Sequence, residues 1–196
     1  MRAPRTAIAL LLWGALLMSG ARPGVAADPD MAGINAMDRP AFVEKFGGIF
    51  EKSPWVAEAA WDRKPFASLD QMHAVMVSVV KFAPLPRQLA LLQAHPDLAG
   101  KEAQAGAMTA SSVSEQAAAG LNALSAAEMK QITDDNAAYK QRFGFPFIIA
   151  VRMHTKEGIF FDFAQRLRND TQTEYVNDLQ NVYAITRLRL EKLLGG

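Results

Sequence analysis

Apolar residues recur along this chain with the three- and four-residue spacing of amphipathic helices. The pattern is clearest from Ser68 to Ala83 and from Thr155 to Asn169. Only one run, Phe145 to Val151, has the composition of a β-strand, and a single strand cannot form a sheet. The spacing therefore predicts an all-α fold.

Three segments begin with the S/T-x-x-E pattern of a capping box, in which a hydroxyl and a carboxylate accept backbone N–H groups at a helix start. The pairs are Ser112 with Glu115, Ser125 with Glu128, and Thr171 with Glu174. They predict helices at about 112–123, 125–142 and 171–194.

Prolines and glycines mark the shorter helices of the first half. Asp38 is placed to cap a helix that starts at Arg39-Pro40, and Gly47-Gly48 interrupts that helix. Ser53-Pro54 opens a second short helix. The apolar residues available for its buried side are Trp55, Ala59 and Ala60.

Pro84 and Pro86 are expected to end the long helix that begins at Ser68, with one more short helix at residues 87–94. Residues 95–111 contain proline and glycine with little apolar periodicity, and we expect them to be mostly loop. The sequence contains no internal repeat and no second-domain linker. It predicts a single compact multi-helix domain.

The first residues have the layout of a secretory signal. Arg2 and Arg5 are followed by an apolar run of 12 residues, 7–18, and small residues at 25–27 offer a cleavage site. Such a run rises only about 18 Å as a helix, too short for a hydrocarbon core of about 30 Å. We therefore expect residues 1–27 to be a signal peptide and residues 28–196 to form the domain, which would place the protein in the periplasm.

Two other interpretations of this segment stay open. It could remain uncleaved as an N-terminal anchor. Alternatively, the true start could be Met31 or Met37, which would give a cytoplasmic protein. In the export interpretation, no stable membrane association is expected after cleavage.

Composition narrows the possible chemistry. The chain has 21 Lys+Arg and 20 Asp+Glu, a formal charge of +1, so no basic field points to nucleic acid. Cysteine is absent and histidine occurs three times, which leaves no thiolate site and few imidazoles. No phosphate-binding loop or metal-binding motif is present. We expect neither a metal nor a cofactor.

His95 is the residue best placed for acid–base chemistry. It begins the sequence His95-Pro96-Asp97 at a helix-to-loop junction, and an imidazole titrates near neutral pH. Glu115 follows 20 residues later. Both have structural interpretations that stay open: His95 as a helix C-terminal residue stabilised by the dipole, and Glu115 as part of a capping box. Arg152 could bind a carboxylate or form a structural ion pair.

Five segments carry a resemblance to a known family. They are FGGIFEKSPWVAEAAW (46–61), QLALLQAHPDLAGK (88–101), SSVSEQAAAGLNAL (111–124), NAAYKQRFGFPFIIAVR (136–152) and RLRND (166–170). In this order they resemble the 2-oxo-4-hydroxy-4-carboxy-5-ureidoimidazoline (OHCU) decarboxylase family of urate degradation. The resemblance implies packed α-helices, cofactor-free decarboxylation of OHCU, (S)-allantoin as product and a possible homodimer.

The resemblance also implies roles for individual residues. It makes His95 the catalytic proton donor and Glu115 the acidic, also catalytic, member of the helix-start cluster at Ser112 to Gln116. The implied substrate-binding residues are Pro96, Ser112, Val113, Ser114, Glu115, Gln116, Phe147, Ile148, Ile149, Ala150 and Val151. Gln165 departs from the family's usual glutamate, outside the expected pocket, which puts packing rather than activity in question.

Two other classes of function are compatible with the residues. One is a periplasmic helical binding or adaptor protein, which would need no catalytic histidine. The other is a lyase or hydrolase that acts on a different ureide in the same pocket. The small-molecule partner would differ, but neither class requires nucleic acid.

Overall fold

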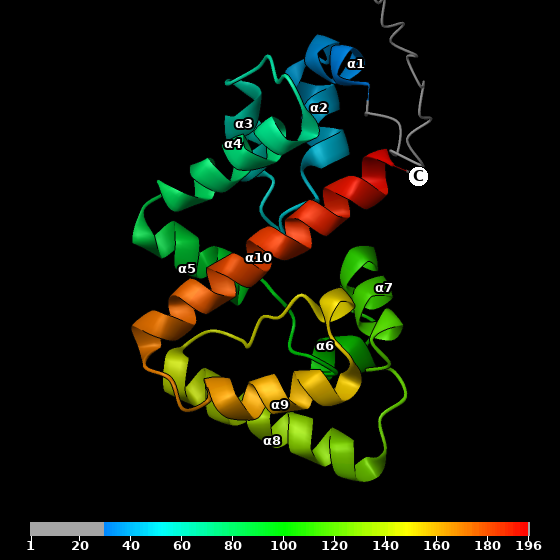
Figure 1. Ribbon diagram of the computed structural model, residues 1–196, viewed down its shortest axis with the longest axis vertical. Helices are drawn as coiled ribbons and strands as arrows, with labels where there is room; N and C mark the ends of the chain where they lie inside the picture. The colour runs from blue at the N-terminus through cyan, green and yellow to red at the C-terminus, as the bar shows by residue number, and fades with distance from the viewer. Residues whose placement is uncertain (1–29, 196) are drawn as a thin grey trace, which may run out of the picture.

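The computed structural model describes residues 30–195, and the predicted signal peptide at 1–27 lies outside this range. The described chain forms helices and no β-strand (Figure 1). The helices are α1 (Met31–Ala36), α2 (Arg39–Phe46), α3 (Trp55–Trp61), α4 (Leu69–Lys81), α5 (Leu85–Gln93), α6 (Lys101–Gln104), α7 (Ala110–Ala118), α8 (Ala126–Phe143), the 3-10 turn η1 (Val151–Met153), α9 (Lys156–Arg166) and α10 (Thr171–Leu194). The predicted all-α class and single domain are confirmed.

Helix α10 connects the two halves of the molecule (Figure 1). Its 24 residues extend about 36 Å, and it contacts α4 on one side and α8 on the other. Helix α3 packs against both α2 and α4 in the upper half of the view, and α8 packs against α9 in the lower half. A residue on α10 can therefore reach elements that are far apart in the sequence.

Aromatic rings fill the core of the α8–α9 half. The Tyr139 ring lies 5.4 Å from Phe147 and 5.7 Å from Phe163, in edge-to-face arrangements. Phe147 and Phe163 are stacked, with ring centroids 3.9 Å apart. The β-like run is thus buried as an irregular segment that packs against helices, which explains why its apolar composition does not produce a strand.

Only one of the three predicted capping boxes forms. At α8, the Ser125 hydroxyl accepts the Glu128 N–H and the Glu128 carboxylate accepts the Ser125 N–H. Helix α7 is capped instead by Thr109, which accepts the N–H of Ser112. Helix α10 is capped by Asp170. The predictions at Ser112 and Thr171 are wrong because a cap-forming side chain lies one to three residues earlier in each case.

Several other predicted boundaries also shift. Pro86 lies in the first turn of α5, where proline is tolerated, so this helix begins earlier than predicted. Helix α6 lies within the predicted loop at 95–111, and α7 ends at Ala118, before Gly120 takes a φ of +74°. The buried side of α3 is Val56, Ala57 and Ala60, and the predicted Trp55 and Ala59 are only partly buried.

No single helix within residues 30–195 is both long and apolar enough to cross a bilayer. Helices α4 and α5 reach that length and composition only when taken together, and they are bent by 112° at the break between them.

Candidate active site

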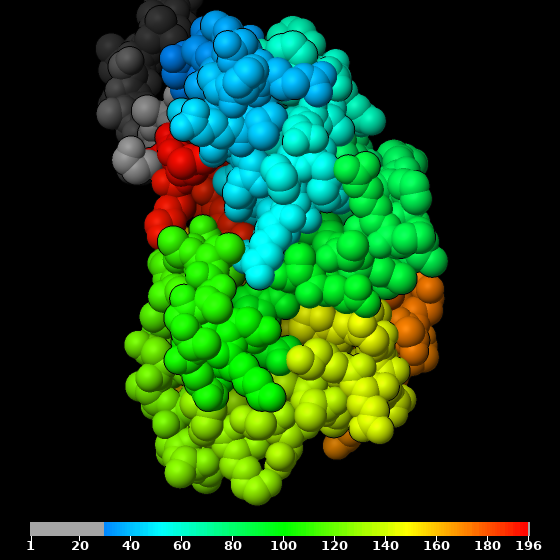
Figure 2. Space-filling view, turned by 180° about the vertical axis from the view of Figure 1, so that it is seen from behind, coloured from blue at the N-terminus to red at the C-terminus, as the bar shows by residue number. Residues whose placement is uncertain are grey.

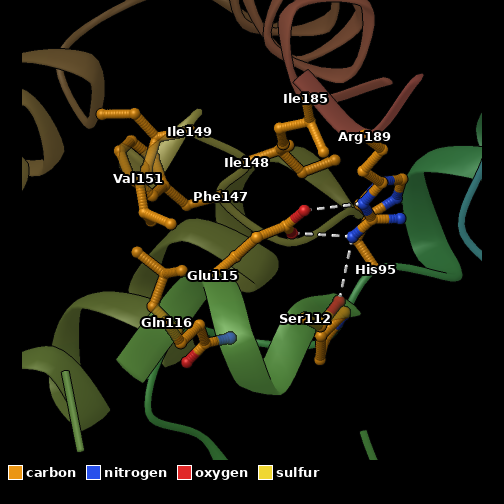
Figure 3. A pocket seen from close by; sticks show the side chains of 12 residues that line it. His95, Ser112, Glu115, Gln116, Phe147, Ile148, Ile149, Val151, Ile185 and Arg189 are labelled. Carbon is orange, nitrogen blue, oxygen red and sulfur yellow. Dashed lines mark hydrogen bonds and ion pairs between the residues drawn. The ribbon is translucent and has the colours of Figure 1, made fainter. Parts of the chain in front are cut away.

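A narrow cavity lies where the end of α5, the start of α7, the 147–151 segment and α10 meet (Figure 3). Segments distant in sequence come together here. The part of the chain around α6 and α7 and the part around residues 145–160 lie side by side on one face (Figure 2). The lining residues are His95, Pro96, Leu98, Ser112, Glu115, Gln116, Phe147, Ile148, Ile149, Val151, Ile185 and Arg189.

His95 comes immediately after Ala94, the residue that caps the end of α5, and lies half-buried at the cavity. Its Nδ1 lies 2.9 Å from the carbonyl oxygen of Leu91, so in the neutral ring this nitrogen carries the proton and donates it. Nε2 is then the lone-pair nitrogen and forms no hydrogen bond with the residues described. Burial holds the pKa of His95 below its ordinary value, although Glu51 and Glu115 act in the opposite direction.

Arg189, on α10, connects the polar and charged groups at the cavity through hydrogen bonds. Its Nε and Nη2 donate to the two carboxylate oxygens of Glu115, each over 2.8 Å. Nη1 donates to Glu51 over 3.0 Å and to the carbonyl of Ile49 over 3.3 Å, and Nη2 also donates to Ser112 over 3.2 Å. All five N–H groups of the guanidinium are therefore engaged.

Glu51 supports this arrangement from a buried position behind Arg189 and Ser112. Its side chain is 1% exposed, and the Ser112 hydroxyl donates to Oε2 over 3.0 Å. Burial tends to raise the pKa of Glu51, but Arg189, Thr109 and His95 together outweigh burial and hold the pKa below its ordinary value. Glu51 therefore stays ionised and, with Glu115, gives Arg189 two carboxylate partners.

The 147–151 segment is fixed by side chains from α9 and α10. The N–H of Ile148 donates to Asp178 over 3.0 Å, and the N–H of Ala150 donates to Asn181 over 3.0 Å. Arg166 donates to the carbonyl oxygen of Ile148 over 2.8 Å. These bonds hold an irregular segment in one conformation and make it a rigid wall of the cavity.

Asp178 lies between this wall and a buried ionic network. Burial raises the pKa of Asp178 to about 7, against the opposing effect of Arg166, which donates to it over 2.6 Å. Arg166 also donates to Glu174, which is fully buried and is held ionised by a hydroxyl from Tyr139 and an amide from Asn169. The network explains why Glu174 does not act in a capping box.

Most of the predicted site residues meet at the cavity, but three do not line it. Val113 and Ser114 lie on the exposed side of α7, and Ala150 turns its backbone N–H to Asn181. Gln116 lines the cavity while its amide oxygen accepts the N–H of Ala99 over 2.8 Å, which fixes the loop after His95. The roles of all the predicted site residues in substrate binding stay predictions.

The prediction from sequence omitted Glu51 and Arg189. Glu51 lies inside the quoted segment 46–61, but nothing in its spacing separates it from a surface glutamate. Arg189 had a detectable signal. It follows Val182 and Ile185 at positions i+7 and i+4 on the buried side of α10, where an apolar residue is expected.

The positions of two residues bear on earlier interpretations. Gln165 is exposed on α9, away from the cavity, as expected. Arg152 is exposed and forms no ion pair with residues 30–195. Within that same range, no three His, Asp or Glu side chains are grouped closely enough to hold a metal ion.

Comparisons with known proteins identify the family of this chain. The family model for OHCU decarboxylase matches residues 35–191. The chain belongs to the OHCU decarboxylase family. It is 39% identical to the OHCU decarboxylase of Amia calva over 84% of this chain and 94% of that protein. It is 38% identical to the enzyme of Mus musculus over 85% of this chain and 93% of that protein.

Solved structures give the same result for the fold of this OHCU decarboxylase family member. It superposes on a crystal structure of (S)-allantoin synthase with a TM-score of 0.68 and 27% identity, over 84% of this chain and 54% of that one. A crystal structure of OHCU decarboxylase in the presence of (S)-allantoin matches with a TM-score of 0.59 and 21% identity, over 72% of this chain and 92% of that one.

Proposed function

We propose that this protein decarboxylates OHCU to (S)-allantoin in urate degradation, without a metal or cofactor. The chain belongs to the OHCU decarboxylase family. The observation that carries the proposal is its cavity, in which Nε2 of His95 has no hydrogen-bond partner among the described residues and lies near the Glu51–Arg189–Glu115 cluster. Among the candidate classes considered from sequence, only this enzyme accounts for both the family and the imidazole.

The substrate itself supplies the electron sink that a cofactor often provides. When the bond from ring carbon 4 to the carboxylate breaks, CO₂ leaves and its electron pair forms a double bond between carbons 4 and 5. The pair of the ring C=N bond moves onto nitrogen, which takes a proton from water. The protein therefore needs to orient the ring and control one further proton transfer.

His95 is placed for that transfer. Because Nδ1–H is bonded to Leu91, the neutral ring first accepts a proton at Nε2 and only then can give one. We infer that Nε2 takes the proton of the 4-hydroxyl, which becomes a carbonyl, and returns it to carbon 5. Delivery from one side of a fixed ring yields one enantiomer. Glu51 and Glu115 favour the transient imidazolium.

The other walls position the ring. Phe147, Ile149 and Val151 provide an apolar face on the clamped segment, and Ser112 and Gln116 add polar groups from α7. Glu115 acts through Arg189 in this account, so it is a positioning residue. Catalysis is assigned to His95.

The direct test adds the purified protein to OHCU freshly made from urate by oxidation and 5-hydroxyisourate hydrolysis. Circular dichroism should show (S)-allantoin forming faster than in the spontaneous, racemic reaction, and the rate should survive chelator treatment and dialysis. Formation at the spontaneous rate would contradict the proposal. A rate that is lost and then restored by a divalent metal would contradict the cofactor-free mechanism.

We also propose that the protein is exported and begins near Asp28. The charged, apolar and small-residue order of residues 1–27 supports this. Intact-mass measurement of protein from its native host should give a chain starting at Asp28, whereas a chain starting at Met1, Met31 or Met37 would contradict export. The homodimer that the resemblance implies stays a prediction.

A further inference from the structure

A second and larger hollow adjoins the catalytic cavity. It has a volume of about 340 Å³, compared with about 30 Å³ for the catalytic cavity. We call it the vestibule. It is lined by Lys45, Gly48, Ile49, Ser111, Ser114, Glu115, Arg152, Arg189, Lys192 and Leu193. Glu115 and Arg189 line both spaces, so their ion pair forms the wall between them.

The vestibule gathers positive charge from three separate elements. Lys45 comes from α2, Arg152 from η1 and Lys192 from α10. Within residues 30–195 none of the three takes part in an ion pair, and the one hydrogen bond among these side chains runs from Lys192 to the Ser114 hydroxyl over 3.3 Å. The carboxylate in the lining, Glu115, is already paired with Arg189.

In the catalytic cavity, by contrast, the cationic side chain Arg189 has no free donor with which to bind a ligand. The guanidinium of Arg189 uses all five donors within the protein and faces two carboxylates, Glu51 and Glu115. An approaching carboxylate therefore finds no free N–H donor on Arg189 in the cavity, whereas the vestibule offers uncompensated positive charge. The vestibule also has the volume typical of a small-molecule site, about 300–1,000 Å³.

We infer that the vestibule is an anion-binding site that captures small carboxylates and delivers them to the catalytic cavity. Clefts lined by positive charge raise the local concentration of anionic ligands and their association rates by about 10–10³-fold. The identity of the natural ligand as OHCU rests on the proposed function, whereas the anion site itself rests on the arrangement of charges.

Binding can be tested without any turnover. The probe is malonate, titrated into ¹⁵N-labelled protein and followed by amide chemical shifts. We expect malonate to perturb the amides around Arg152 and Lys192, and the triple variant Lys45→Gln, Arg152→Gln, Lys192→Gln to weaken its binding at least about tenfold. The matched control neutralises three exposed cations elsewhere, Lys81→Gln, Lys130→Gln and Arg168→Gln, and should bind malonate like the wild type.

A kinetic measurement completes the test. With OHCU, the triple variant should lose about tenfold in kcat/KM while kcat changes less than twofold, and the dependence of kcat/KM on salt should flatten. Malonate binding that is equal in the triple variant and the wild type would overturn the assignment of the vestibule as an anion-binding site, whatever the activity. Malonate binding that depends on the three cations, in a protein without decarboxylase activity, would instead overturn the proposed function and leave the anion site standing.

Discussion

Arg189 and Glu115 are joined by two parallel hydrogen bonds, from Nε to Oε1 and from Nη2 to Oε2, each 2.8 Å long. The residues are 74 positions apart, and the pair fastens the last helix to α7. Bidentate pairs of this kind fix orientation as well as charge. The pair therefore sets the shape of the cavity beside His95 and separates it from the vestibule.

Glu115→Gln should weaken the bidentate pair with Arg189 while keeping a side chain of nearly the same shape. The amide can accept one hydrogen bond but loses the charge, and hydrogen bonds to charged groups contribute about 1.5–3 kcal/mol. We expect the free energy of unfolding to fall by about that amount and kcat/KM to fall about tenfold or more. Chemical denaturation and steady-state kinetics measure both. The exposed Glu157→Gln on α9 is the control, and equal behaviour of the two variants would contradict the role of Glu115.

The pH dependence of kcat/KM should report His95. Proton transfer through Nε2 requires a neutral His95 ring in the free enzyme, and burial holds the pKa of His95 below its ordinary value of about 6.5. Protonation at lower pH fills Nε2, so kcat/KM should be level near neutral pH and fall on the acid side, with a midpoint below 6.5. A fall that begins above neutral pH as the pH decreases, or a rate that rises as His95 becomes cationic, would show that the ring does not act as the initial acceptor.

Asn181→Ala tests whether the clamp on the 147–151 segment matters for binding. The variant removes the acceptor of the Ala150 N–H, a bond of 3.0 Å that contributes about 0.5–1.5 kcal/mol. We expect KM to rise severalfold with a smaller change in kcat, because the wall positions the ring but transfers no proton. Unchanged KM in a variant with wild-type stability would show that the segment keeps its conformation without this bond.

The start of α10 offers a test of stability alone. Asp170 caps the helix in the structure, whereas Thr171 was the residue predicted from sequence. Asp170→Ala should lower the free energy of unfolding by about 1 kcal/mol, and Thr171→Ala should change it by less than about 0.5 kcal/mol. Thermal melts of the two variants compare them directly. A larger loss at Thr171 than at Asp170 would contradict the observed cap.

Local signals carried much of the fold. Ser125 with Glu128 forms the predicted capping box, and the amphipathic pattern at Ser68–Ala83 becomes α4. The same signals failed where a competing cap lay close by, as at Thr109 and Asp170.

Only the part of the site that has local sequence signals could be predicted. His95 and Glu115 stand out because of the residue types and helix ends around them. Glu51 and Arg189 become partners only when α10 crosses the domain, across 138 positions of sequence, and no local spacing encodes that contact.

His95 carries the central claim, and His95→Asn tests it with its own control. The variant keeps a polar side chain but cannot relay a proton at neutral pH. His73→Asn removes the half-buried histidine whose Nε2 lies 3.0 Å from the Thr186 hydroxyl, on α4 and outside the catalytic cavity. Melting curves should show that both variants remain folded.

The decisive measurement is the rate of (S)-allantoin formation from OHCU, followed by circular dichroism, for the wild type, His95→Asn and His73→Asn. Positioned proton transfer contributes about 10²–10⁴-fold, so kcat of His95→Asn should fall by that factor while His73→Asn keeps its turnover. Wild-type turnover by a folded His95→Asn variant would contradict the assignment of His95 as the residue that moves the proton.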